Sequence, residues 1–157
     1  MVSINSAAEA AVAAYSAAIA LGGNYSVPLQ EAASEVSSFF LPNYSSFTMG
    51  KITLSSNQSV VAENFIKEYD EFRASGGPGT DVHVTHSRVE AVSDESALCW
   101  LTYHICPING MQGWDWTNVY GFRIVKGGIA NGLEGGWEFA IGDNEDSQYT
   151  KRFPNAS

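Results

Sequence analysis

The strongest constraint on the fold is a change of side-chain periodicity about halfway along the chain. From Thr80 onward, apolar and polar residues alternate with a period of two, which is typical of strands. Segments of this kind cover residues 80–92, 96–106, 114–126 and 133–142, and short runs rich in turn-forming residues separate them. Because parallel strands need crossover connections of a dozen or more residues, these short connections predict an antiparallel meander.

Before Thr80, apolar residues recur with helical spacing instead. The spacing predicts helices over residues 5–22, 28–40 and 59–74, the first of them capped by Asn5 or Ser6. Residues 44–54 are predicted to form one or two short extended segments, interrupted at Gly50. Three helices packed on one face of a strongly curved antiparallel sheet give an α+β domain whose interior is a cone closed by the helices.

Composition indicates one globular domain that spans residues 1–157. The formal net charge of -9 argues against nucleic acids and anionic membranes as partners. No apolar run reaches the ~20 residues needed to span a bilayer. The Ala-rich N-terminus lacks a basic residue before its apolar part and is interrupted by Glu9, unlike a secretory signal. We therefore expect a cytoplasmic protein that binds neither nucleic acid nor membranes.

The sequence shows no pattern of a metal or phosphate site. Cys99 and Cys106 are seven positions apart on one predicted strand, which separates them by roughly 23 Å, too far for a disulfide. We expect both to be buried, inert thiols, and no CxxC pair supports zinc binding. The glycine-rich run at 76–80 lacks the lysine of a phosphate-binding loop. We expect no metal ion and no cofactor.

The predicted strand over residues 114–126 carries an unusual face. Alternation places large aromatic side chains and one amide on that face: Trp114, Trp116, Asn118, Tyr120, Phe122 and, at its end, Ile124. A buried amide needs a hydrogen-bond partner, because an unpaired one costs about 1–3 kcal/mol. Either the face lines a pocket in which Asn118 meets a ligand, or Asn118 bonds a neighbouring backbone group in an ordinary core.

Pairing of the preceding two strands suggests an acid/base residue. If Asp94 and Glu95 form a two-residue turn, His86 lies opposite Tyr103 on one face of the hairpin, and His104 lies on the other face. His86 is then the leading general acid/base, with Tyr103 as a hydrogen-bond donor and His104 as the second candidate. A bulge would exchange the two faces, and His86 would then be an ordinary exposed histidine.

The carboxylates give no comparable signal. Glu63, Glu68, Asp70 and Glu71 are interpreted as the solvated face of the third helix. Asp143, after the last strand, is interpreted as a helix cap or a turn residue.

Three segments carry a resemblance to a known family: RVEAVSDESALCWLTYHICP at 88–107, NVYGF at 118–122 and GWEFAIG at 136–142. With the order of elements, they make the chain resemble the NTF2-like superfamily of SnoaL-type cyclases, ketosteroid isomerases and scytalone dehydratases. The similarity is closest to SnoaL-like and scytalone dehydratase-like proteins. The resemblance implies the cone-shaped α+β fold.

At the level of residues, the resemblance places Asn118 on an asparagine that holds the ligand of scytalone dehydratase. Trp116 stands where that enzyme has a serine, and its two catalytic histidines fall on Val82, beside His83, and on Pro107. Its tyrosine–aspartate pair has no counterpart at 22–25. The resemblance therefore implies the fold but not the dehydration of scytalone.

Together these observations predict a cofactor-independent isomerase, dehydratase or cyclase that acts on a small apolar polyketide- or terpenoid-like compound. Its binding residues are Asn118 and the aromatic walls Trp114, Trp116, Tyr120, Phe122 and Trp137. The alternatives are a non-catalytic small-molecule-binding protein of the same fold and a structural homodimer. An open sheet face rich in Val and Thr predicts a homo-oligomer, most simply a dimer.

Overall fold

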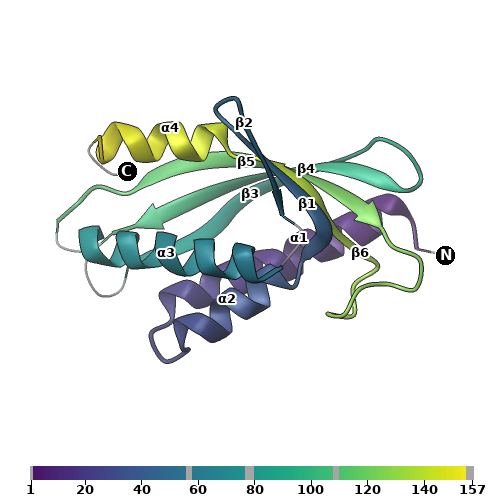
Figure 1. Ribbon diagram of the computed structural model, residues 1–157, viewed down its shortest axis with the longest axis horizontal. Coiled ribbons are helices and arrows are strands. Elements are labelled where there is room, and N and C mark those ends of the chain that lie inside the picture. The colour runs from purple at the N-terminus through teal and green to yellow at the C-terminus, as the bar shows by residue number, and fades with distance from the viewer. Residues whose placement is uncertain (1, 56–57, 77–79, 108–109, 155–157) are drawn as a thin grey trace.

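The computed structural model describes residues 2–55, 58–76, 80–107 and 110–154. They form an α+β fold in which helices pack against one face of a six-stranded sheet (Figure 1). The helical elements are α1 (Ile4–Ala20), the 3-10 helix η1 (Leu21–Gly23), α2 (Leu29–Ser37), α3 (Gln58–Gly76) and α4 (Asp143–Arg152). The strands are β1 (Phe40–Thr48), β2 (Lys51–Ser55), β3 (Asp81–Ala91), β4 (Ser96–Cys106), β5 (Trp114–Ile124) and β6 (Gly135–Ile141). The strand order across the sheet is β2-β1-β6-β5-β4-β3. The predicted α+β class is confirmed.

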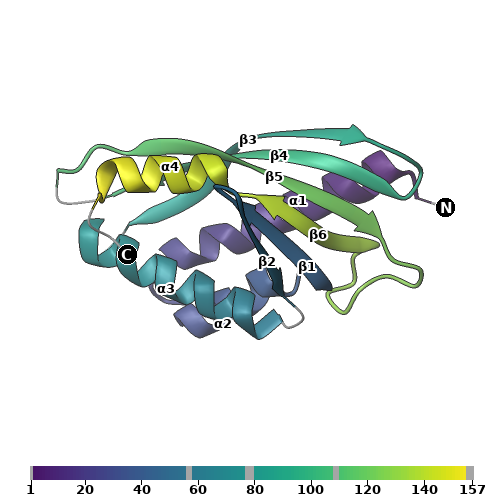
Figure 2. The ribbon, with the colours of Figure 1, turned by 45° about the horizontal axis from the view of Figure 1, so that its top comes forward.

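Helix α1 is a core helix that crosses the inner face of the sheet (Figure 2). The Ser3 hydroxyl accepts the Ser6 N–H at 3.2 Å, so the cap lies before the predicted Asn5 or Ser6. By length and composition alone, Ile4–Gly23 could cross a membrane. Its buried side chains, however, belong to the core cluster, so the fold indicates no membrane protein.

The sheet is mixed, whereas the sequence predicted a purely antiparallel meander. Strand β1 pairs antiparallel with β2 but parallel with β6, with Phe47 opposite Ile141. Parallel pairing needs a long connection, which α3 and the strands between β1 and β6 provide. Short loops constrain only strands that follow each other directly, so they carried no information about β1 and β6.

The β3–β4 hairpin has a different register from the predicted one. Ala91 pairs with Ala97, and the Val92 N–H donates to the Ser96 carbonyl, so the turn is longer than Asp94-Glu95. The register shifts again between Val84 and His86. As a result Val84, not His86, lies opposite Tyr103, and His86 lies opposite Thr102.

One boundary, one cysteine and one helix also differ from the prediction. Helix α2 ends at Ser37 and β1 begins at Phe40, three residues after the helix, because the apolar run SSFF fits either period. Cys106, expected to be buried, is exposed at the end of β4, while Cys99 is buried as expected. Helix α4 was not predicted, because its ten residues include no buried side chain and therefore show no apolar stripe.

Candidate functional site

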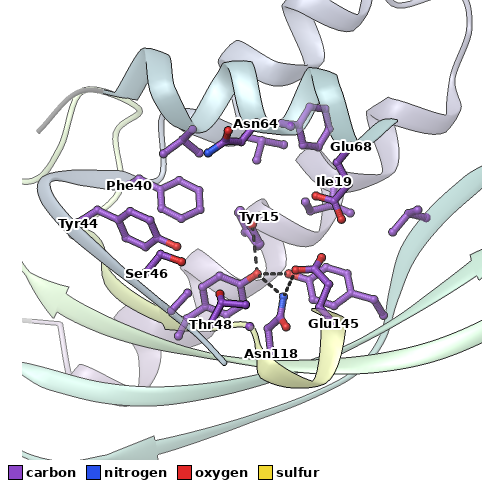
Figure 3. A pocket seen from close by; sticks show the side chains of 18 of the residues that line it. Tyr15, Ile19, Phe40, Tyr44, Ser46, Thr48, Asn64, Glu68, Asn118 and Glu145 are labelled. Atoms are coloured by element: carbon purple, nitrogen blue, oxygen red, sulfur yellow. Dashed lines mark hydrogen bonds between the residues drawn. The ribbon is translucent and has the colours of Figure 1, made fainter. Parts of the chain in front are cut away.

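A cavity of about 240 Å³ lies between the inner face of the sheet and the helices α1 and α3 (Figure 3). Strands β4 and β5 form its floor, and β1 and the first turn of α4 form part of its rim. Its polar lining includes Tyr15, Glu68, Tyr103, Asn118, Tyr120 and Glu145. The remaining lining is largely aromatic and aliphatic, with Phe40, Phe65, Phe72, Val82 and Trp116 among its members.

Strand β5 presents the centre of its predicted aromatic face to this cavity. Trp116, Asn118 and Tyr120 line it and are 4%, 5% and 4% exposed. The period of two was therefore sufficient to find these three residues. The pocket interpretation of Asn118 is supported, because its amide faces other side chains of the cavity and not a backbone group.

Three aromatic residues predicted to form cavity walls belong to the closed core instead. Phe122 and Trp137 are 0% exposed, and their rings pack 6.0 Å apart where the cone narrows. Trp114 lies at the opposite end of β5 and packs against Phe153. These rings share the inner face with Asn118, but the cavity occupies only the middle of that face.

Three tyrosine hydroxyls meet at the bottom of the cavity. The Tyr103 and Tyr120 hydroxyl oxygens are 2.6 Å apart, and those of Tyr15 and Tyr120 are 3.5 Å apart. Burial raises the pKa of Tyr120 to about 12, with a further increase from the nearby Glu145 carboxyl. Burial likewise raises the pKa values of Tyr15 and Tyr103 well above the ordinary range. The cluster is therefore neutral and resists any added negative charge.

Asn118 connects this cluster to a carboxyl group. Its Nδ2 donates to the Tyr120 hydroxyl at 3.4 Å and to Glu145 Oε2 at 3.3 Å (Figure 3). Its Oδ1 and the Trp116 Nε1 are buried without a hydrogen-bond partner among the described residues. Unsatisfied buried groups of this kind are costly in an empty cavity and favour a ligand that satisfies them.

Two half-buried carboxyls, from Glu68 on α3 and Glu145 on α4, share the cavity. Loss of water raises the pKa of Glu68 well above its ordinary value, and the charge of Glu145 and a hydrogen bond between the two carboxyls raise it further. Loss of water also raises the pKa of Glu145, although hydrogen bonds from Glu68 and Asn118 oppose this effect. Two such carboxyls do not ionise together readily, so the pair holds one proton more tightly than an isolated carboxyl does.

Sequence reasoning missed this pair. It assigned Glu68 to the solvated face of the third helix, which is wrong. The available signal was its position three residues after Phe65 and four before Phe72, which places it on their face of the helix. Glu145 carried no signal, because α4 is polar all around. Asp143 begins α4 and accepts the Met49 N–H at 2.7 Å, in line with the predicted cap or turn role.

The two histidines proposed as acid/base residues lie outside the cavity lining. His86 is exposed, with its Nδ1 3.3 Å from the Thr85 hydroxyl, so the predicted inward orientation is wrong. The bulge near Thr85 and the longer turn produce this reversal. His104 lies beside Asp115 on the outer face, with Nδ1 2.5 Å from Oδ1. Tyr103 does line the cavity.

No group of three or more His, Cys, Asp or Glu side chains that could hold a metal ion occurs within the described ranges. The chemistry that the cavity offers is hydrogen bonding from Asn118 and the tyrosines and proton exchange with the carboxyl pair.

No protein-family model matches the sequence, and no curated protein shows significant similarity to it. Solved structures do resemble the fold. An NTF2-like protein of unknown function from Shewanella oneidensis has a TM-score of 0.61 at 7% identity, over 87% of this chain and 96% of that chain.

Two other similar structures have descriptions that refer to an activity. A provisionally assigned scytalone dehydratase from Novosphingobium aromaticivorans has a TM-score of 0.56 at 10% identity, over 86% of this chain and 79% of that one. A ketosteroid isomerase-like protein from Erwinia carotovora has a TM-score of 0.55 at 12% identity, over 85% of this chain and 89% of that chain. At such low identity the likeness concerns the fold alone, and on that basis the chain has the NTF2-like, cystatin-like fold that its sequence resembles.

Proposed function

We propose that the protein catalyses the cofactor-independent isomerisation, dehydration or cyclisation of a small, largely apolar compound by proton transfer inside the cavity. The observation that carries this proposal is the pair of carboxyls, Glu68 and Glu145, within a cavity lined mostly by aromatic and aliphatic side chains. A carboxyl whose pKa is raised above its ordinary value is suited to acid/base catalysis, because it accepts a proton more readily than an ordinary glutamate and can return it.

The hydrogen bonds suggest a division of roles. Asn118 donates to Glu145 and so fixes the orientation of that carboxyl. Glu145, in its ionised form, takes a proton from a substrate carbon, and the proton passes to its oxygen. Glu68, in its protonated form, returns a proton at a second carbon or to a departing hydroxyl. Tyr120 and Trp116 hold the substrate by hydrogen bonding and ring contact.

Polyketide- and terpenoid-like compounds are the proposed substrates, because a rigid hydrocarbon skeleton fits the aromatic and aliphatic part of the lining. The similar structures named for scytalone dehydratase and ketosteroid isomerase support proton-transfer chemistry on this fold only by analogy. We also propose that the protein is cytoplasmic.

Variants of the two carboxyls test the function. We expect Glu68→Gln and Glu145→Gln each to lower turnover about a hundredfold or more, the usual contribution of a positioned acid or base. A panel of cyclic ketones and polycyclic phenols in deuterated water, followed by NMR, reports exchange of substrate C–H groups as well as net conversion. Circular dichroism verifies that each variant is folded.

Two matched variants sharpen the test. Glu63→Gln changes an exposed carboxyl of α3 outside the lining, and His86→Ala removes the exposed histidine; we expect both to keep full turnover. If turnover survives in Glu145→Gln, or is lost in His86→Ala, the roles assigned above are wrong. Tight binding of a ligand without exchange or conversion favours the alternative function, a non-catalytic small-molecule-binding protein.

A further inference from the structure

The ionisable groups of the cavity lining include acidic side chains but no basic ones. Its ionisable lining residues are tyrosines and the two glutamates, and no Lys, Arg or His side chain of the described residues lines it. The tyrosines are neutral, so any charge that the described lining carries is the negative charge of the Glu68 and Glu145 carboxyls. That charge has no counter-ion within the cavity lining.

Hydrogen-bond acceptors are also available without partners. Asn118 is 5% exposed and lines the same cavity, and its Oδ1 accepts no hydrogen bond from the described residues. Together with the carboxylate oxygens, this group suits a ligand that donates N–H bonds. The unpaired Trp116 Nε1 is a donor that suits an oxygen elsewhere on the same ligand.

Aromatic side chains surround these acceptors. The rings of Tyr103 and Trp116 are stacked with centroids 5.3 Å apart, and Phe72 packs 6.1 Å from Trp116. Tyr69 and Phe65 line the cavity from α3 with ring centroids 4.5 Å apart. Ring faces attract organic cations, at about 0.5–2 kcal/mol for each good contact.

We propose that the ligand of this cavity is a small organic monocation, a protonated amine or iminium with an apolar body. Its positive nitrogen lies against the Glu68–Glu145 pair, and its body lies against the aromatic lining. This inference rests on the proposed function only in placing the ligand beside the two glutamates. It replaces the neutral polyketide- or terpenoid-like compound of that proposal by a compound that carries a positive charge, and it excludes carboxylates and phosphates as ligands.

A cationic substrate also fits proton transfer in this environment. When a carboxylate removes a proton from the carbon next to an iminium group, the C–H bond breaks and an O–H bond forms. The C–H electron pair becomes a carbon–carbon double bond, and the C=N π pair moves to the nitrogen, which becomes neutral. Both charges disappear, which a cavity of low polarity favours. A neutral ketone would instead move the negative charge from the carboxylate to an enolate, which no cation of the described lining balances.

Three probes of similar size separate the effect of charge from that of shape: 2-phenylethylamine, 2-phenylethanol and phenylacetate. Isothermal titration calorimetry on the full chain at neutral pH measures their affinities. We expect the amine to bind at least about tenfold more tightly than the alcohol, and phenylacetate to bind most weakly. We also expect the doubly neutral variant Glu68→Gln/Glu145→Gln to bind amine and alcohol about equally, while Glu63→Gln keeps the preference.

Two results overturn the inference. One is an amine that binds no better than the alcohol, or not at all up to millimolar concentration. The other is a preference that persists in the folded double variant. These measurements need no turnover, so their failure is distinct from that of the proposed function. Amine binding, together with no exchange or conversion of any compound in the turnover panel, would support the ligand class and reject the enzyme. Conversion of neutral compounds without amine binding would do the reverse.

Discussion

At the scale of single residues, the site depends on polar groups that only partly satisfy one another. Tyr120 is the centre of this network, because Tyr15, Tyr103 and Asn118 all approach its hydroxyl. Asn118 links the hydroxyl to Glu145, so the orientation of one carboxyl depends on a side chain two residues away from Tyr120 on the same strand face. Changes at Tyr120 should therefore affect stability and the site together.

Replacing Tyr120 by Phe keeps the ring but removes the hydroxyl from the network. We expect the free energy of unfolding to fall by about 1–3 kcal/mol, because the buried Tyr103 hydroxyl loses its partner at 2.6 Å. Chemical denaturation measures this loss. Tyr103→Phe combined with Tyr120→Phe should cost less than the sum of the two single changes; additivity within about 0.5 kcal/mol would show that the hydroxyls are not coupled.

At the scale of elements, α4 continues the wall of the cone where β6 stops. Strand β6 pairs with β5 only from Val119 onward, and before that point the Thr117 N–H donates to Asn144 Oδ1 at 2.7 Å. This contact and the one between Asp143 and Met49 hold the first turn of α4, which carries Glu145. Polar contacts therefore position the start of α4, while further along Tyr149 packs its ring against Phe72 and donates its hydroxyl to Glu71.

Asn144→Ala tests this attachment. We expect the Thr117 amide to exchange its hydrogen about fivefold faster, because it loses an acceptor whose hydrogen bond contributes about 1 kcal/mol. Amide hydrogen exchange followed by NMR measures the effect. Ser147→Ala, on the same helix but bonded only to the Asn144 carbonyl among the described residues, is the control and should leave Thr117 unchanged. Equal protection in Asn144→Ala and wild type would contradict the attachment.

At the scale of the whole molecule, the acidic side chains and the uncovered face of the sheet have separate consequences. The formal net charge is -9, and two carboxyls with raised pKa values lie inside the cone. The helices α1, α2 and α3 occupy one side of the sheet (Figure 2). The other face carries exposed apolar side chains. The raised pKa values of the two carboxyls determine how stability depends on pH. The exposed apolar face of the sheet affects self-association.

Stability should fall as pH rises above the ordinary glutamate pKa of 4.5 and through the raised values of Glu68 and Glu145. The folded state holds these protons more tightly than the unfolded state does, so the stabilisation is complete at low pH and is lost on ionisation. Denaturant unfolding across this range measures the fall. Glu68→Gln should flatten it and Glu63→Gln should not; a wild-type stability that rises through the same window would contradict the pKa directions.

We propose that the outer sheet face pairs two copies of the chain. A row of apolar side chains crosses five strands in register on that face: Ile52, Phe47, Ile141, Val119 and Trp100. Analytical ultracentrifugation should find a dimer for the wild type and a monomer for Phe47→Glu, because a buried unpaired charge is costly. Val92→Glu, in the β3–β4 turn, should remain dimeric. A monomeric wild type would overturn this proposal.

The sequence by itself determined the class of fold and three residues that line the cavity. The periods of 3.6 and 2 located α1, α3 and the strands from β3 to β6, and the alternation in β5 placed Trp116, Asn118 and Tyr120 on the inner face. Such patterns are local: they report which side of an element faces apolar surroundings. They depend on side-chain character alone, so they can be read without knowledge of what the element contacts.

The tertiary structure alone decided what those faces meet. One bulge and one longer turn reversed His86, because a shift of one residue moves a strand side chain to the opposite face. The parallel contact of β1 with β6 and the placement of α4 arise from segments far apart in the chain. The carboxyl pair exists only because α3 and α4 meet at the rim of the cone. Its raised pKa values follow from that burial and mutual proximity, which no single segment encodes.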